Sequence, residues 1–427
     1  MNSRHMTVAA LAAAGALTLS ACGTGSSSNN SGSSGSSSGS GSASGQVTGG
    51  PGIDTAGKTI HITSITALSG PASALGIPAL AGARTALKAI NAAGGVDGYK
   101  IKMSVKDSGY VPQNHVQAYK ATVGDSAMIQ SFGSPTTKAI QPLFDREGIV
   151  VQPLSWDSVW SKDPNLAPVG VPYATDVKNG LEYLSKQKKL GTKVGIVYQD
   201  DEYGADALRG YKEAVKAGGL DDVAQAPFKV GDTDFTAQVQ KLKSKGAQIV
   251  LVTALPSASA PIVGTAASLG YNPTYLFQGP AWLEQIFTKD GTKSGKPTPV
   301  AGALAKQTYV LAFAAPWGSD VPGMAQMLAD QKQYAPKQIP SEYFTFGYAQ
   351  GKIIGAILKK AVQNGDLSRA GILKAKESLG SVDLGGLAPS PDYTSGGSPV
   401  STKSIIARVD KNTTGFLKPV ASGVTGQ

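Results

Sequence analysis

Hydrophobic and polar positions along the chain follow two periods, one typical of strands and one of helices. Residues 59–66 are mainly apolar and β-branched, as in a strand, whereas Leu80, Ala83, Leu87 and Ile90 recur on one face of a helix. A strand pattern followed by a helix pattern then repeats along the chain. Further expected strands are 100–106, 149–151, 194–198, 248–253, 274–277, 307–311 and 404–409, and further helices are 111–123, 137–147, 203–217, 257–269, 323–334 and 343–361. Repeated strand–helix units predict an α/β fold with doubly wound, mostly parallel sheets.

A loop of small and polar residues, 130–140, stands out in this series. An apolar run precedes it, and an amphipathic helical run follows it. Strand, small-residue loop and helix is the order in which an α/β sheet presents hydroxyl and backbone N–H groups to a ligand. Gly133 allows close backbone approach, and Ser134 or Thr137 could contact a guest molecule. The alternative is that these hydroxyls only cap the helix.

The first residues differ from the rest of the chain. An apolar stretch, 8–19, is too short to span a membrane and ends in Leu19-Ser20-Ala21-Cys22. This ending resembles the lipobox of bacterial lipoproteins, which implies a signal peptide over residues 1–22 and acylation of Cys22. Residues 23–57 are mostly serine and glycine at first, and we expect them to form a disordered tether.

Two series of strands and helices, with segments that return late in the chain, indicate two lobes in the 427 residues. We expect residues 58–172 plus 310–390 in the N-terminal lobe and 173–309 plus 391–427 in the C-terminal lobe.

Composition argues against several classes of function. The net charge is +10, but the lysines are scattered and form no nucleic-acid-binding run. The chain has 3 histidines, none at metal-ligand spacing, and no phosphate-binding loop or nucleophile motif is present. We therefore expect no enzyme activity, no metal and no cofactor.

Several short motifs keep a familiar order. They are Leu68-Ser69-Gly70-Pro71, Ile90-Asn91-Ala92-Ala93-Gly94-Gly95, Gly133-Ser134, Tyr203-Gly204, Gly279-Pro280 and Gly347-Tyr348-Ala349. From about Lys58 onward the chain resembles type I periplasmic solute-binding proteins, in the leucine/isoleucine/valine-binding branch of ABC importers. The resemblance implies two lobes joined by three crossings, a small solute held between them, and delivery to permease subunits. It also implies an extracytoplasmic monomer, anchored here to the outer face of the cell membrane by its lipid.

The resemblance also implies a set of ligand-binding residues. They are Ser69, Leu75, Phe132, Ser134, Thr137, Ser155, Trp156, Tyr203, Leu255, Ala281 and Trp282. In amino-acid binders the residue after the Gly-Pro is a carboxylate that neutralises the ligand ammonium, and here it is Ala281. A buried ammonium without a counter-charge is costly, so we expect an uncharged or anionic organic solute rather than a zwitterionic amino acid.

Alternatives stay open at these positions. Glu284 could replace the missing carboxylate, which would make the chain a true amino-acid binder. Trp156 and Trp282 could pack at the edges of the lobes, and Tyr203 could pack with its hydroxyl in water. A receptor module that passes ligand occupancy to a signalling partner is the alternative to import.

Overall fold

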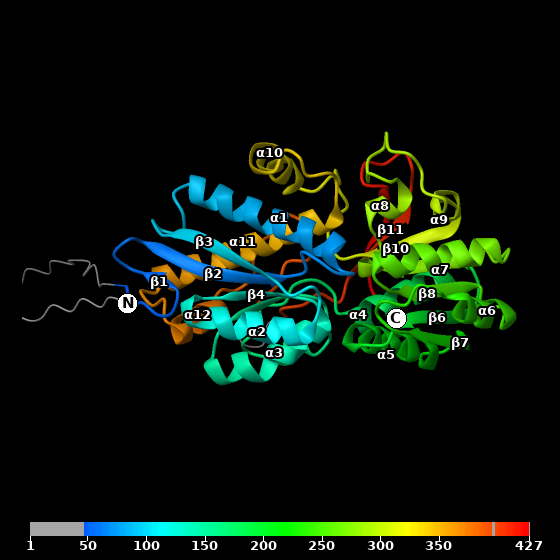
Figure 1. The fold of residues 1–427 in the computed structure, drawn as a ribbon, viewed down its shortest axis with the longest axis horizontal. Coiled ribbons are helices and arrows are strands. Elements are labelled where there is room, and N and C mark those ends of the chain that lie inside the picture. The colour runs from blue at the N-terminus through cyan, green and yellow to red at the C-terminus, as the bar shows by residue number, and fades with distance from the viewer. Residues whose placement is uncertain (1–46, 395–397, 427) are drawn as a thin grey trace, which may run out of the picture. The chain divides into compact units, whose positions relative to one another are not determined.

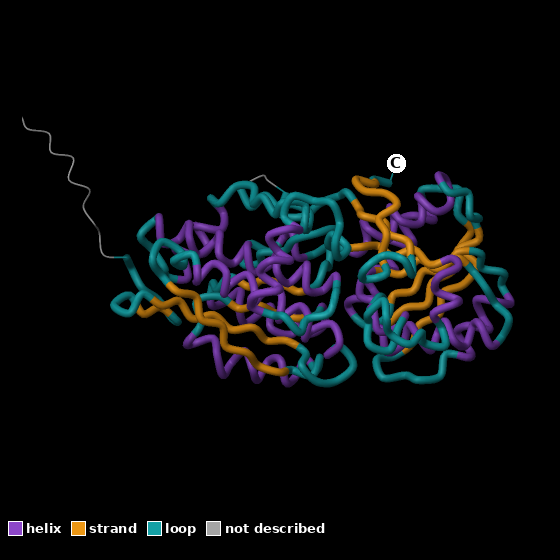
Figure 2. Tube along the Cα trace, turned by 90° about the horizontal axis from the view of Figure 1, so that it is seen from above, coloured by secondary structure: helices purple, strands orange, loops and turns teal. Residues whose placement is uncertain are grey.

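The structure, a computed structural model, describes residues 47–394 and 398–426. In this part of the chain, helices and strands form two groups, each built on one sheet, which we call lobe 1 and lobe 2 (Figures 1 and 2). The expected signal peptide, Cys22 and most of the expected tether lie outside the described residues. Within the described ranges, no helix is long and apolar enough to cross a membrane.

The sheet of lobe 1 has five strands among the described residues, and β2, β3, β4 and β5 run parallel. Its strands are β1 (Ile53–Asp54), β2 (Thr59–Thr66), β3 (Lys100–Asp107), β4 (Ile129–Phe132) and β5 (Val151–Leu154). Its helices are α1 (Ser73–Ala92), α2 (Pro112–Thr122), α3 (Ser134–Glu147), α10 (Met324–Tyr334), α11 (Glu342–Gln363) and α12 (Arg369–Glu377). Helices α1 and α11 pack together on one face of the sheet, and α2 and α3 on the other (Figure 1).

The sheet of lobe 2 has seven strands in the described residues, in the order β12-β11-β10-β9-β8-β6-β7. They are β6 (Lys193–Gln199), β7 (Asp221–Phe228), β8 (Ile249–Thr253), β9 (Thr274–Gln278), β10 (Thr308–Ala312), β11 (Ser404–Val409) and β12 (Leu417–Val424). Only β11 and β12 pair antiparallel with their neighbours. The helices are α4 (Tyr173–Glu182), α5 (Glu202–Lys216), α6 (Thr236–Ser244), α7 (Pro256–Ser268), α8 (Glu284–Phe287) and α9 (Ala301–Gln307). The predicted mostly parallel α/β architecture is confirmed.

The chain passes from lobe 1 to lobe 2 between β5 and α4, returns between β10 and α10, and passes again between α12 and β11. The expected lobe boundary at residue 310 falls inside β10, which pairs with β9 and β11. Strand β10 therefore belongs to lobe 2 along its whole length.

The end of the expected tether belongs to the folded body. Strand β1 pairs antiparallel with the start of β2. Just before it, the N–H of Thr48 donates to the Gly365 carbonyl at 2.9 Å, and the N–H of Leu367 donates to the Thr48 carbonyl at 2.8 Å. The prediction of a disordered segment reaching residue 57 is therefore wrong from Thr48 on, because these backbone groups find partners on lobe 1.

Candidate functional site

The candidate site lies where strand ends from both lobes meet. Since parallel strands have their carboxyl ends at one edge of a sheet, the residues that follow them gather there. Tyr110 follows β3 and Ser134 follows β4, while Asp201 follows β6 and Phe313 follows β10. Tyr110 in lobe 1 lies close enough to Gln199, Asp201 and Tyr203 of lobe 2 for these groups to affect the pKa of its hydroxyl. The two edges therefore face one another.

Helix α3 begins at Ser134, three residues before the predicted start. Gly133 precedes the helix with φ +93°, a conformation that favours glycine. A Cβ at this position would lie 2.5 Å from Cε2 of Tyr110, so glycine also allows that ring to approach. No side chain caps the helix, and the interpretation of Ser134 as an N-cap is wrong.

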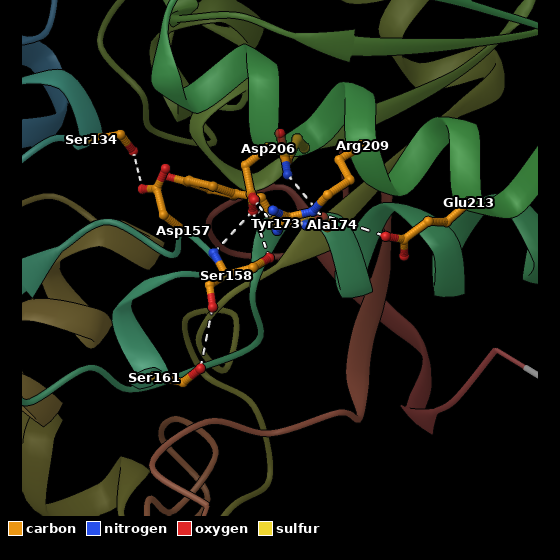
Figure 3. A network of polar contacts seen from close by, with 10 residues as sticks. Ser134, Asp157, Ser158, Ser161, Tyr173, Ala174, Asp206, Arg209 and Glu213 are labelled. Atoms are coloured by element: carbon orange, nitrogen blue, oxygen red, sulfur yellow. Dashed lines mark hydrogen bonds and ion pairs between the residues drawn. The ribbon is translucent and has the colours of Figure 1, made fainter. Parts of the chain in front are cut away.

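The Ser134 hydroxyl instead donates to Oδ2 of Asp157, just beyond β5, and Figure 3 shows the two side chains pointing toward each other. Asp157 is only 6% exposed. Burial raises the pKa of its carboxyl to about 8, the hydrogen bond from Ser134 opposes the rise, and the negative charges of Asp206 and Asp201 add to it. The hydroxyl that we expected to meet the ligand thus holds a carboxyl of the chain itself.

Aromatic rings from both lobes and from the crossings between them pack around Trp156. The ring centroid of Trp156 lies 4.4 Å from that of Phe313, 4.5 Å from Phe346 and 5.8 Å from Tyr173. Tyr173 in turn lies 4.8 Å from Tyr203. Trp156 is 5% exposed and belongs to this interlobe cluster, which is more than packing at the edge of one lobe.

Polar atoms in this cluster lack hydrogen-bond partners. Nε1 of Trp156 and the hydroxyls of Tyr203 and Tyr343 are buried and make no hydrogen bond within the described residues. The N–H of Ala254 lies near the Tyr203 hydroxyl but outside hydrogen-bond geometry. Because buried polar groups are nearly always paired, these three atoms mark a place where a bound solute would supply partners.

Asp206 on α5 fixes the crossing that carries Asp157 (Figure 3). Its Oδ2 accepts from the N–H of Ser158 at 3.1 Å, from Oγ of Ser158 at 2.9 Å and from the N–H of Ala174 at 3.2 Å. Its Oδ1 pairs with Arg209, which also lies 3.9 Å from Glu213. One carboxylate of lobe 2 therefore holds both ends of the segment between β5 and α4.

Two further carboxyls, Glu284 and Glu342, lie buried beside the aromatic cluster. Oε1 of Glu342 accepts from the N–H of Phe313 at 2.6 Å, and the N–H of Glu342 donates to Glu284 at 3.2 Å. Burial raises the pKa of Glu284 to about 7 and also raises the pKa of Glu342, where the charge of Glu284 adds to the rise. Each carboxyl has one oxygen without a partner among the described residues.

Other predicted residues lie at varied distances from this cluster. Ser69 is exposed, and its N–H donates to Asp107 at 3.3 Å. Oγ of Ser155 accepts from the indole N–H of Trp160 at 2.9 Å, and Oγ1 of Thr137 lies 2.7 Å from Oγ of Ser131, so both hydroxyls are used internally. The remaining predicted residues, Leu75, Phe132, Leu255, Ala281 and Trp282, are all buried.

Sequence reasoning missed several residues of the cluster. They are Tyr110, Asp157, Tyr173, Phe313, Tyr343 and Phe346. Their position was the available signal, because four of them stand within three residues of a strand end or at the first residue of a helix. Within the described residues, no group of histidine, cysteine or carboxylate side chains could hold a metal ion.

A large hollow lies elsewhere on the described part of the chain. An open groove of about 730 Å³ borders β1, β2 and β3 on lobe 1, with His61, Arg84 and Lys106 among its residues. None of the residues that line this groove has a buried side-chain polar atom without a hydrogen-bond partner, in contrast to the interlobe cluster.

Comparison with known proteins agrees with this geometry. Residues 59–414 match the periplasmic binding protein family. Leu/Ile/Val-binding protein homolog 7 of Brucella abortus is 26% identical over 349 residues, which are 78% of this chain and 84% of the relative. Homolog 3 of Brucella melitensis is 32% identical over 202 residues, which are 45% of this chain and 53% of the relative.

Two solved structures extend the comparison. The fatty acid ABC transporter substrate-binding protein from Thermomonospora curvata is 28% identical, with a TM-score of 0.82 over 89% of this chain and 95% of that one. The branched chain amino acid ABC transporter from Thermus thermophilus with bound valine has a TM-score of 0.75 at 19% identity, over 86% of this chain and 96% of that one, and shows the shared fold.

The chain belongs to the periplasmic binding protein family, and leucine/isoleucine/valine-binding proteins are among the relatives that it resembles. Members of this family bind solutes outside the cytoplasm and are not enzymes, which confirms the predicted class. A role in binding a small solute follows from membership of this family.

Proposed function

We propose that this protein is a lipid-anchored, monomeric receptor that captures an organic carboxylate with an apolar body and delivers it to the permease subunits of an ABC importer. The observation that carries the proposal is the aromatic cluster around Trp156, which combines apolar surface from both lobes with unpartnered polar atoms. Such a site suits an apolar body with one polar end.

The absence of a carboxylate at Ala281 supports a solute without an ammonium group. Glu284 is buried; its Oε1 accepts from the N–H of Glu342, its Oε2 has no partner among the described residues, and its raised pKa of about 7 makes it a weaker counter-charge than an ordinary carboxylate. The relative from Thermomonospora curvata is named as a fatty acid substrate-binding protein, which agrees with an apolar carboxylate. Capture then proceeds by closure of the two lobes, driven by contacts that exist only in the closed form.

Calorimetric titration of the full-length chain tests the class of solute. We expect octanoate or phenylacetate to bind at pH 7 and leucine not to bind. A Trp156→Phe variant, which removes the unpartnered Nε1, should weaken binding by roughly tenfold, in line with the loss of a buried hydrogen bond. Trp317→Phe is the matched control, because Trp317 packs on Phe344 outside the cluster. Micromolar binding of leucine, with neither carboxylate bound, would contradict the proposed class.

Acylation of Cys22 is tested separately. Cells grown with radiolabelled palmitate should incorporate label into the wild-type chain and not into a Cys22→Ser variant. The variant should also be found in the soluble extracytoplasmic fraction, because a chain without lipid has lost its anchor. Equal labelling of both chains would show that Cys22 does not carry the lipid.

A further inference from the structure

The subsite next to Ser134 contains a carboxyl of the chain itself, and this bears on how a carboxylate solute could bind. Ser134 donates to Oδ2 of Asp157 (Figure 3), and among the described residues it is the only side chain that donates to this carboxyl. The side chain is 6% exposed, so water does not solvate it well. A second carboxylate placed beside an ionised Asp157 would meet strong repulsion, because charges interact strongly in a poorly solvated interior.

Among the described residues, the charged side chains that act most on Asp157 are Asp206 and Asp201, whose negative charges do not relieve this repulsion. Asp201 and Asp206 approach from the start of α5, Tyr110 from the end of β3, and Tyr173 from the start of α4. Arg209, the cation drawn in Figure 3, is engaged by Asp206 and Glu213.

Buried basic residues elsewhere do not supply a positive charge to a carboxylate beside Asp157. Among the described residues they are His115 and Lys376. Nε2 of His115 lies 2.9 Å from Oγ of Ser131, and burial lowers the pKa of this ring to about 3, so it is neutral. Nζ of Lys376 donates to the carbonyls of Pro164 and Leu166. Among the described residues, no buried basic side chain is therefore available to a carboxylate at this subsite, and a proton can offset its charge instead.

We propose that Asp157 keeps its proton and donates it from Oδ1 to the carboxylate of the bound solute, while Ser134 donates to Oδ2. The solute's head group is thus recognised by a shared proton and not by a cation. This inference rests on the proposed function, since it presumes a carboxylate solute. Its consequence is that the proton must be taken up from water when the carboxylate binds to an ionised Asp157.

The pH dependence of binding tests the proposal. The pKa of Asp157 is about 8, so the change in binding affinity should occur near this pH. The other buried carboxyls titrate lower, because the pKa is about 6 for Asp201 and about 7 for Glu284 and Asp176. Burial raises the pKa values of Tyr110 and Tyr173 well above 10, so their hydroxyls stay neutral. Affinity for a carboxylate should change little between pH 6.5 and 7.5 and fall about tenfold per pH unit above pH 8.5.

The probes are octanoate and its uncharged analogue octanamide, titrated calorimetrically into the full-length chain from pH 6.5 to 9.5. Octanamide should bind with an affinity that is nearly independent of pH, because its amide can donate to an ionised Asp157. In an Asp157→Asn variant, the amide still donates, so octanoate should bind at pH 6.5 and keep its affinity up to pH 9.5. Asp176→Asn is the matched control, because it removes another buried carboxyl of raised pKa, on α4 beside Ser404. In this variant the affinity for octanoate should still fall above pH 8.5, as in the wild type.

Four outcomes of these titrations would overturn the proposal that Asp157 shares its proton with the solute. A flat octanoate profile in the wild type, or an unchanged decline in Asp157→Asn, would overturn the shared proton. Loss of octanoate binding in a folded Asp157→Asn variant at pH 6.5 would overturn it too, because a neutral donor would then be insufficient. If neither octanoate nor phenylacetate binds at any pH, the carboxylate class itself fails, and the shared proton with it. The wild-type profiles of the two probes are decisive even if the variant does not fold.

Discussion

Asp206 offers the sharpest test of how the site is held in place. Its side chain is 7% exposed, and its Oδ2 accepts two backbone N–H groups and one hydroxyl. An Asp206→Ala variant leaves the N–H groups of Ser158 and Ala174 without their acceptor. At about 1 kcal/mol for each of these hydrogen bonds, we expect a loss of roughly 3 kcal/mol in the free energy of unfolding.

Two matched variants separate the backbone bonds from the ion pair. Asp206→Asn keeps an oxygen that can accept from the two N–H groups, so it should cost only about 1 kcal/mol. Arg209→Ala removes the ion pair alone, and since the Arg209 side chain is 45% exposed, its loss should cost less than about 1 kcal/mol. Urea unfolding followed by circular dichroism, with an unchanged denaturant slope, measures all three. If Arg209→Ala cost as much as Asp206→Ala, the hydrogen bonds to the crossing would not be the main contribution.

Three further outcomes follow from other contacts. Gly170→Ala should lower the free energy of unfolding by about 2–3 kcal/mol, because φ is +103° and the new Cβ would lie 2.5 Å from Nε1 of Trp156. Urea unfolding measures the loss, and the additional substitution Trp156→Phe should recover part of it. The raised pKa of Asp157 favours the folded state fully below about pH 4, and this contribution to stability is lost as pH rises toward about 8. The free energy of unfolding of Asp157→Asn, relative to that of the wild type, should therefore rise by up to about 1.4 kcal/mol per pH unit across that range. Thermal unfolding at several pH values measures this difference. Lys376→Met should cost about 2 kcal/mol in the same urea assay, because the carbonyls of Pro164 and Leu166 lose their donor, and a neutral result would refute this.

The fold could be predicted from the sequence where periodicity was strong. The predicted strands at residues 59–66 and 404–409 coincide with β2 and β11. Strand β7 was missed because Asp221 and Asp222 open it and Pro227 interrupts it, a composition that disfavours strands. Helix α3 starts earlier than predicted, at Ser134, because the left-handed conformation of Gly133 places the following residues directly in a helix.

The site was harder to predict, since its contacts join residues far apart in the chain. Ser134 could be chosen from its place after a strand, but its partner Asp157 lies 23 residues further on. That the two would meet depends on the register of β4 beside β5, which a single sequence does not reveal. The aromatic cluster likewise combines Trp156 with Phe313 and Phe346, which become neighbours only when the crossings between the lobes are in place.

The hydrogen bonds of Thr48 determine where tension on the N-terminal end of the body would act. Thr48 joins the segment between α11 and α12, and five residues later β1 begins to pair with β2. A pull from upstream is therefore carried first by backbone bonds inside lobe 1, and it reaches lobe 2 through the crossings and the contacts between the lobes. Lobe 1 is therefore the part of the body that bears such a load first.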